Sequence, residues 1–216
     1  MGLYFKQVEL GPMANYVYLI GDTETKEMAV VDPAWDLPAI YSIAEQEGMQ
    51  ITKAFITHGH PDHINAVEDL INEKNAQVYM HKEEVPWIKG WKETAIGTET
   101  GDEIAIGNQK IKVIHTPGHT EGSQCFMFGE KMLSGDTLFL DGCGRTDLPG
   151  GNAEKLYYTF HDIIKNLPKQ TIIYPGHNYA HDHCQSLEQQ CQTNPYLRAH
   201  TKDEFISLIK PGFRSL

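Results

Sequence analysis

Short apolar stretches separated by turn residues make up the first third of the chain. β-branched and aromatic side chains gather in residues 3–8, 15–21 and 28–31, as is typical of strands. Residue 33 is a proline, which cannot continue a central strand and fits a turn. We therefore expect three short strands, the last of which ends before this proline.

Helical and extended spacing then alternate. Apolar positions in residues 36–48 recur at helical intervals and end at a glycine, a typical helix stop. Residues 51–57 form an apolar run that predicts a buried strand, and residues 64–71 have the spacing of an amphipathic helix. The rest of the chain predicts strands over 110–115, 124–128, 131–135 and 171–174, and a helix over 153–167.

Two segments of the second half depart from this alternation. Residues 138–151 contain four glycines and one proline, so we expect no regular element there. Residues 182–209 are predicted to be mostly helical, with a break at Asn194-Pro195. Because strands and helices mix throughout without a change in composition, we predict a single α/β domain over residues 1–216.

The chain carries a formal net charge of -11, from 18 lysines and arginines against 29 aspartates and glutamates. Nucleic acids and anionic membranes both attract dense basic surfaces, and no stretch of the sequence supplies one. We therefore expect neither nucleic acid nor membrane as a partner. Small molecules stay open as ligands, and the sequence does not set the oligomeric state.

Three further properties bear on localisation. The N-terminus lacks the basic and apolar regions of a signal peptide, and no window has the apolar length to span a bilayer. The four cysteines are too few and too scattered for a disulfide scaffold. We therefore expect a cytoplasmic protein.

Four potential metal ligands lie within six residues, directly after the predicted strand 51–57. His58, His60, Asp62 and His63 form the sequence His-Gly-His-Pro-Asp-His. In an extended or tightly looped segment, the first two point to one side and the last two can turn toward another, which suits two neighbouring metals. Imidazole and carboxylate suit zinc, iron or manganese. We interpret this segment as a metal site rather than a solvated, histidine-rich loop.

Three later strand ends carry one candidate ligand each. They are His119 in Thr-Pro-Gly-His-Thr, Asp136 in Ser-Gly-Asp-Thr, and His177 in Tyr-Pro-Gly-His-Asn. Each follows an apolar strand and a glycine, which lets the backbone come close to another group. With the first segment, they assign five of the eleven histidines to metal binding.

In this order the motifs resemble those of the metallo-β-lactamase superfamily, and they extend over most of the chain. The resemblance implies a four-layer αββα sandwich, in which two sheets pack face to face with helices outside. It places the metals in a cleft where the loops at the strand ends meet. An aspartate rather than a cysteine at position 136 argues against the antibiotic-hydrolysing lactamases.

The resemblance also implies the ligand sets of two divalent ions, zinc first, with iron or manganese as alternatives. Carried over by position, it assigns His58, His60 and His119 to the first metal, Asp62, His63 and His177 to the second, and Asp136 to a bridge between them. Asp32, before Pro33, is expected to accept the free N–H of a ligating histidine.

Two branches of the superfamily are similar to this chain. Thioester hydrolases of the glyoxalase II type resemble it in residues 57–63, in the loop 144–151, in Tyr174-Pro-Gly-His177 with Tyr179, and in the tail motif Asn194-Pro-Tyr-Leu-Arg198. This resemblance implies cleavage of a thioester of the hydroxyacylglutathione type. Thr146 and Asp147 stand where a glutathione-contacting tyrosine is expected, so a different thiol carrier stays open.

Persulfide dioxygenases are the alternative. They resemble the chain in Gly142-Cys-Gly-Arg-Thr-Asp147 and in Asn194-Pro-Tyr-Leu, and they use one iron held by the equivalents of His58, His119 and Asp136. Gly59 and the pair Pro175-Gly176 are more similar to the hydrolases, so we favour the hydrolase.

In the hydrolase, a water between the two metals would lose a proton near neutral pH and attack the thioester carbonyl. Asp136 would orient the metal pair, and Asp62 would hold the second metal and accept a hydrogen bond from the nucleophile. Arg145 either grips a substrate carboxylate or amide, or braces its loop through Asp147. Tyr179 is a weaker candidate for substrate contact. His181-Asp-His-Cys184 is interpreted as the solvated start of a helix.

Overall fold

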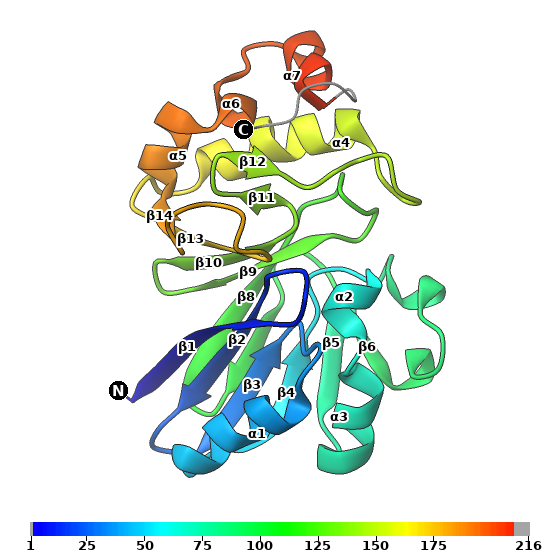
Figure 1. The fold of residues 1–216 in the computed structure, drawn as a ribbon, viewed down its shortest axis with the longest axis vertical. Coiled ribbons are helices and arrows are strands. Elements are labelled where there is room, and N and C mark those ends of the chain that lie inside the picture. Colours follow the sequence, from blue (N-terminus) through cyan, green and yellow to red (C-terminus); the bar gives the residue numbers. More distant parts are fainter. Residues whose placement is uncertain (1, 210–216) are drawn as a thin grey trace.

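The computed structural model describes residues 2–209 and shows two sheets packed against each other, with helices on the outer side of each (Figure 1). The first sheet contains β1 (Leu3–Leu10), β2 (Asn15–Asp22), β3 (Glu27–Val31), β4 (Gln50–Phe55), β5 (Gln77–His81) and β6 (Ala95–Thr98). The second contains β7 (Glu103–Ile106), β8 (Gln109–His115), β9 (Gln124–Phe128), β10 (Lys131–Gly135), β13 (Ile172–Pro175) and β14 (Gln185–Ser186). A separate ribbon consists of β11 (Leu138–Phe139) and β12 (Gly142–Cys143).

The helices divide between the two sheets. On the first sheet lie α1 (Leu37–Gln46), α2 (Pro61–Ile64) and α3 (Val67–Lys74), followed by the short turns η1 (Val85–Trp87) and η2 (Lys92–Thr94). On the second lie α4 (Ala153–Tyr158) with its continuations η3 (Thr159–Ile163) and η4 (Ile164–Asn166), then α5 (Leu187–Thr193), α6 (Pro195–Arg198) and α7 (Lys202–Ile209). None of the helices in residues 2–209 combines the length and apolar character needed to cross a bilayer.

Both sheets are mixed. In the first, the strands follow chain order from β1 to β6, antiparallel up to β3 and parallel from β3 onward. The second has the order β14-β13-β10-β9-β8-β7, and only its pair β10 and β13 is parallel. Parallel neighbours end at the same edge of a sheet, so loops that follow them are brought together.

Three apolar cores separate the four layers. Val17 and Leu19 of β2 pack with α1 and α3, whereas Tyr18 and Ile20 of the same strand face the second sheet. Successive side chains of a strand point to opposite faces, so β2 contributes to both cores. The third core packs β10 and β13 against the helices of the second half, with Phe160 at its centre. The expected αββα sandwich is confirmed.

Three strands between residues 77 and 106 were missed by the sequence prediction. β6 exposes Ile96 and Gly97, so its pattern lacks the alternation of a half-buried strand. β7 is the edge strand of the second sheet and exposes alternate residues to solvent. Pairing with neighbouring strands, rather than local pattern, makes these segments extended.

Other boundaries also differ from the prediction. The helix expected over 64–71 corresponds to α3, which begins at Val67, whereas Ile64 is the last residue of α2. In the turn between them, the Asn65 side chain accepts the backbone N–H of Trp35 at 2.7 Å. The segment 138–151, expected to be irregular, contains the two-residue strands β11 and β12.

The segment 181–184 does not begin a helix, contrary to the sequence interpretation. It precedes β14, and the helix begins only at Leu187, where Ser186 and Gln189 form a capping box. The ring of His183 is also not simply solvated, because its Nδ1 lies 2.6 Å from the Tyr16 hydroxyl.

Candidate metal centre

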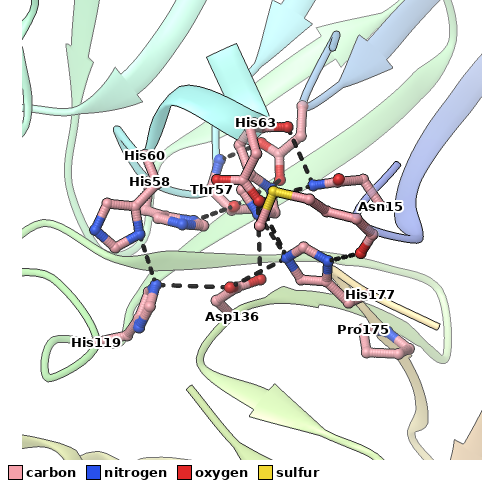
Figure 2. Close-up of polar contacts among 12 residues, drawn as sticks. Asn15, Thr57, His58, His60, His63, His119, Asp136, Pro175 and His177 are labelled. Atoms are coloured by element: carbon pink, nitrogen blue, oxygen red, sulfur yellow. Dashed lines mark hydrogen bonds and ion pairs between the residues drawn. The ribbon is translucent and has the colours of Figure 1, made fainter. Parts of the chain in front are cut away.

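The candidate ligands meet at one edge of the sandwich, where the loops of both sheets converge (Figure 2). His58 and His60 follow β4, Asp62 and His63 lie on α2, His119 follows β8, Asp136 follows β10, and His177 follows β13. Each ligand loop therefore starts at the carboxyl end of a strand, which is where open α/β sheets commonly bind ligands.

Three imidazoles form a first donor group. His58, His60 and His119 each offer a ring nitrogen, and these atoms all lie within 4.8 Å of one another. Nε2 of His119 is 2.9 Å from Nδ1 of His60. Nε2 of His58 is buried and has no hydrogen-bond partner among the described residues. A buried ring nitrogen without a partner is costly unless a ligand takes its lone pair.

A second donor group lies beside the first. Asp62, His63 and His177 offer one atom each, again within 4.8 Å. Nε2 of His63 lies 3.2 Å from Nε2 of His177, and Asp62 Oδ2 lies 3.4 Å from the same atom of His177. All three ligand atoms thus face a common point.

Asp136 lies between the two groups. Its Oδ2 is 3.6 Å from Nε2 of His119 in the first group and 3.4 Å from Nε2 of His177 in the second. Its Oδ1 is 3.3 Å from Nε2 of His63. A single carboxylate therefore faces both groups, which is the placement that a bridging ligand requires.

Asp32 orients one ring of each group, as expected from the sequence. The Thr57 hydroxyl donates to Asp32 Oδ2 at 2.6 Å, so its oxygen is left to accept from Nδ1 of His58 at 3.0 Å. Nδ1 of His63 donates to the same carboxylate oxygen at 2.9 Å. Both rings then carry their proton on Nδ1 and present Nε2 to the site.

Backbone carbonyls fix two more rings in the same way. Nδ1 of His119 lies 2.7 Å from the carbonyl oxygen of Arg145, and Nδ1 of His177 lies 2.9 Å from that of Met13. A carbonyl oxygen only accepts, so each Nδ1 must carry the proton. Each Nε2 is therefore free to bind a cation.

The pKa values of the first group favour neutral rings. Burial, reinforced by the nearby ring of His63, holds the pKa of His58 well below its ordinary value. Burial and the neighbouring His119 lower the pKa of His60 to about 4. These imidazoles are uncharged at neutral pH, which is the form that ligates metals.

The second group is charged when no cation is bound. Burial opposes the charge on His177, but Asp136 and Asp62 overcome it and raise the pKa of this ring to about 9. Asp136 and Asp32 likewise raise the pKa of His63 well above its ordinary value against the effect of burial. A cation that binds here displaces these protons.

The donor set fits a pair of divalent cations. It supplies five imidazoles and two carboxylates, with the unpartnered Nε2 of His58 aimed into the site. Such mixed nitrogen and oxygen ligands are the ones that zinc and similar metals bind.

The glycines that precede the ligands allow this convergence. Gly135, before Asp136, has a φ of 49°, and a side chain added to it would lie 2.5 Å from the Thr57 hydroxyl. A side chain added to Gly176, before His177, would collide with Asp136 Oδ1. The sequence signal of a glycine before each strand-end ligand therefore reflects close packing of the loops.

The donor groups open into a cleft of about 730 Å³. The ligands His60, Asp62 and Asp136 lie at its floor, and Phe139, Leu140, Leu148 and Tyr196 supply apolar walls. The cleft is large enough for a small molecule, and its walls suit an apolar portion of that molecule.

Arg145 and Tyr179 both line this cleft. Arg145 is exposed and makes two hydrogen bonds of 2.7 Å to Asp147. Of the two roles expected for Arg145, the structure therefore shows the pairing with Asp147 within its own loop. Tyr179 is 60% exposed, and its ring stacks on His177 with centroids 4.7 Å apart. Both side chains are placed where they could contact a bound molecule.

Three residues that support the ligands escaped the sequence interpretation. Asn15 donates to Asp62, Trp35 donates to Asn15, and Glu84 accepts backbone N–H groups from two ligand loops. Each makes its contact with a residue at least 20 positions away in the sequence, so no local motif marks them.

Comparison with known proteins identifies a family and several relatives. Residues 10–177 match the family described as the metallo-beta-lactamase superfamily. The chain is 33% identical to the probable polyketide biosynthesis zinc-dependent hydrolase PksB of Bacillus subtilis, over 89% of this chain and 85% of that protein. It is 36% identical to the hydroxyacylglutathione hydrolase of Nitrosococcus oceani, over 76% of this chain and 62% of that protein.

Persulfide dioxygenases are similar to a comparable degree. The human mitochondrial persulfide dioxygenase ETHE1 is 29% identical over 90% of this chain and 76% of its own length. The crystal structure of ETHE1 from Myxococcus xanthus superposes with a TM-score of 0.88 at 30% identity, over 96% of this chain and 90% of that chain.

Proposed function

The chain belongs to the metallo-beta-lactamase superfamily, and we propose that it cleaves a small-molecule thioester at a pair of divalent ions. One observation carries the proposal: two donor groups of three ligands each lie side by side, with the Asp136 carboxylate facing both. Zinc is the first choice of metal, since the relative PksB is described as zinc-dependent.

In this proposal His58, His60 and His119 would hold the first ion, Asp62, His63 and His177 would hold the second, and Asp136 would be shared by both. When bound, divalent ions supply Lewis acidity and make a water acidic enough to lose a proton near neutral pH.

The protein's own groups orient the reactants. Asp62 reaches the cleft, and its carboxylate stays ionised because hydrogen bonding to His177 outweighs the effect of burial and lowers its pKa. An ionised carboxylate accepts a hydrogen bond and thereby aims the attacking water at a carbonyl carbon. Asp32 and the two backbone carbonyls prevent the imidazoles from rotating, so the ligand geometry is set before substrate binds.

The cleft determines how a thioester would lie. An acyl chain would pack on Phe139 and Leu140, and Arg145 at the rim would exchange Asp147 for a carboxylate or amide of the substrate. Tyr179 would contribute an aromatic surface beside the scissile bond. The similarity to a hydroxyacylglutathione hydrolase supports a thioester substrate.

A second candidate is the oxidation of a persulfide at a single iron. The similarity to persulfide dioxygenase ETHE1 favours it, and so does the position of Asp136 Oδ2, 3.6 Å from Nε2 of His119. In that case His58, His119 and Asp136 would hold the ion.

Metal content measured beside two activities separates the candidates. We expect elemental analysis of protein purified without added metal to show two zinc-like ions per chain, and a thiol-release assay to show thioester hydrolysis. One iron per chain with oxygen uptake in the presence of a persulfide would replace the first proposal by the second.

The bridging role has its own variant. Asp136→Ala should lose metal and thioesterase activity together, because both donor groups then lack their shared carboxylate. Asp69→Ala is the matched control, since Asp69 is exposed on α3 and belongs to neither donor group. Full activity in Asp136→Ala would refute the bridge.

A further inference from the structure

The turn between β1 and β2 is built into the second donor group. Asn15, the first residue of β2, is 1% exposed, and its Nδ2 donates to Asp62 at both the carboxylate Oδ2 and the backbone oxygen, each at 3.1 Å. Asn15 also pairs with His177 as an antiparallel bridge. One side chain and its backbone therefore contact two of the three ligands in this group.

Trp35 fixes which way the Asn15 amide points. Its indole Nε1 donates to Asn15 Oδ1 at 2.8 Å. The oxygen end of the amide is thereby committed to the indole, and the NH₂ end must face Asp62. Without that donor the buried Oδ1 would lose its partner, and only the two contacts of Nδ2 would hold the amide beside Asp62. Trp35 thus acts on Asp62 through Asn15.

The turn also supplies backbone contacts to the same group. The carbonyl oxygen of Met13 accepts from Nδ1 of His177, and the carbonyl oxygen of Ala14 accepts from the backbone N–H of Asn178. The first donor group has different supports, namely the Arg145 carbonyl for His119 and Thr57 for His58. The β1–β2 turn and Trp35 are therefore specific to the second group.

Two residues of these supports have an unusual backbone conformation. Trp35 has a φ of 68° and Ala14 a φ of 56°, conformations that non-glycine residues rarely adopt. The Trp35 ring lies directly against Gly11, so that no side chain could be added to that glycine. Surrounding contacts must hold such conformations in place, and strain of this kind is often kept at functional sites.

We propose that Asn15 and Trp35 are positioning residues that set the affinity of the second donor group for its ion, and with it the number of ions that the chain holds. The inference rests on the proposed two-ion function and adds which residues control occupancy of the second position. Partners of metal ligands outside the coordination shell typically contribute about tenfold to 100-fold in metal affinity.

The test is a zinc titration of metal-free protein against a competing chromophoric chelator, which resolves the two dissociation constants. Asn15→Ala removes the donor to Asp62, and we expect the second ion to bind roughly tenfold or more weakly. Trp35→Phe keeps an aromatic ring near Gly11 but removes the indole N–H together with part of the fused ring, and a smaller loss, roughly threefold to tenfold, is expected because Asn15 still donates to Asp62. The first dissociation constant should stay within about twofold in both variants, because its supports are untouched.

Trp87→Phe is the matched control. Trp87 is 76% exposed in η1, and the same chemical change there should leave both constants at their wild-type values. Thermal unfolding of the metal-free proteins checks that each variant is folded. If Asn15→Ala lowers the melting temperature, Trp35→Phe still tests the relay, by which we mean the hydrogen bonds from Trp35 through Asn15 to Asp62.

The outcomes separate this inference from the proposed function. Equal weakening of both ions, or no weakening in either variant, overturns the relay. A wild-type chain that binds a single ion overturns both the relay and the two-ion function. If the wild-type chain binds two ions, the variants weaken only the second, and no thioester is cleaved, the relay is supported and the thioester substrate is ruled out.

Discussion

Glu84 joins two ligand loops that come from different sheets. It lies between β5 and η1 and is 5% exposed. Its Oε2 accepts the backbone N–H of Gly59 at 2.8 Å, and its Oε1 accepts that of Gly122 at 2.9 Å. Gly59 separates His58 from His60, and Gly122 is three residues after His119. One carboxylate thus holds the loops of the whole first donor group.

Glu84→Gln should therefore weaken the first ion. The amide keeps one acceptor, but its NH₂ must face the other backbone N–H, which leaves a buried donor without a partner and costs about 1–3 kcal/mol. We expect the first zinc dissociation constant to rise by roughly tenfold, measured by the same competition titration. Glu83→Gln, at the exposed neighbouring position, is the control. An unchanged first dissociation constant in Glu84→Gln would mean that the two loops keep their positions without the Glu84 carboxylate.

The ligand residues could be predicted from sequence, but most of their supports could not. His58 to His63 form a dense local motif, and His119, Asp136 and His177 each follow a strand and a glycine. Asp32 carried a weaker signal, an aspartate before a proline at a strand end. Glu84, Asn15 and Trp35 carried none, because each acts through a tertiary contact that becomes visible only when the loops are in place.

At the level of elements, the turn between β7 and β8 is held by the first sheet. Glu27, at the start of β3, accepts the backbone N–H of Gly107 at 2.6 Å and the Thr52 hydroxyl at 2.7 Å, and it pairs with Lys53. Partial burial raises the pKa of Glu27, but the hydrogen bonds from Lys53, Thr52 and Gly107 outweigh it, and the net pKa is lowered. The carboxylate thus ties β3 and β4 to the edge of the second sheet.

Glu27→Gln should lower stability in a pH-dependent way. A pKa below the unfolded value means that the ionised form stabilises the fold above about pH 4.5, and that this contribution is lost as the pH falls through the folded-state pKa. We expect a loss of roughly 1–2 kcal/mol at pH 7 that shrinks below pH 4.5. Urea unfolding at a series of pH values measures it, with Glu45→Gln on the exposed face of α1 as the control. A constant difference across the series would exclude the charge as its source.

Prediction of elements succeeded where the element packs on an apolar core. The β-branched and aromatic residues of 15–21 and the helical spacing of residues 36–48 correspond to β2 and α1, and both elements pack on a core. β6 was missed because its exposed positions do not alternate, and β7 because it is only four residues long. The segment 181–184 failed because the capping box at Ser186, further along, sets the start of α5.

For the whole molecule, the ligands tie the two halves of the sandwich together. His58 to His63 belong to the first sheet and its helix, whereas His119, Asp136 and His177 belong to the second. The four-layer arrangement that brings them together followed from the family resemblance, because local spacing does not say which sheet faces which. Ions at this centre would bind the folded chain and not the unfolded one, where the ligands are far apart.

Metal removal should consequently lower the melting temperature. An ion at 100 times its dissociation constant stabilises a fold by about 2.7 kcal/mol. In a chain of this size each kcal/mol shifts the melting temperature by about 2–4 °C, so chelation should lower it by roughly 5–10 °C per ion. Asp136→Ala should show no such shift, because this variant binds no ions and the chelator therefore has nothing to remove. Differential scanning calorimetry with and without chelator measures both proteins.

A wild-type chain that contains zinc and yet melts at the same temperature after chelation would contradict this prediction. The ions would then not stabilise the contact between the two sheets, and the hydrogen bonds of Glu84, Asn15 and Asp32 alone would hold the loops together.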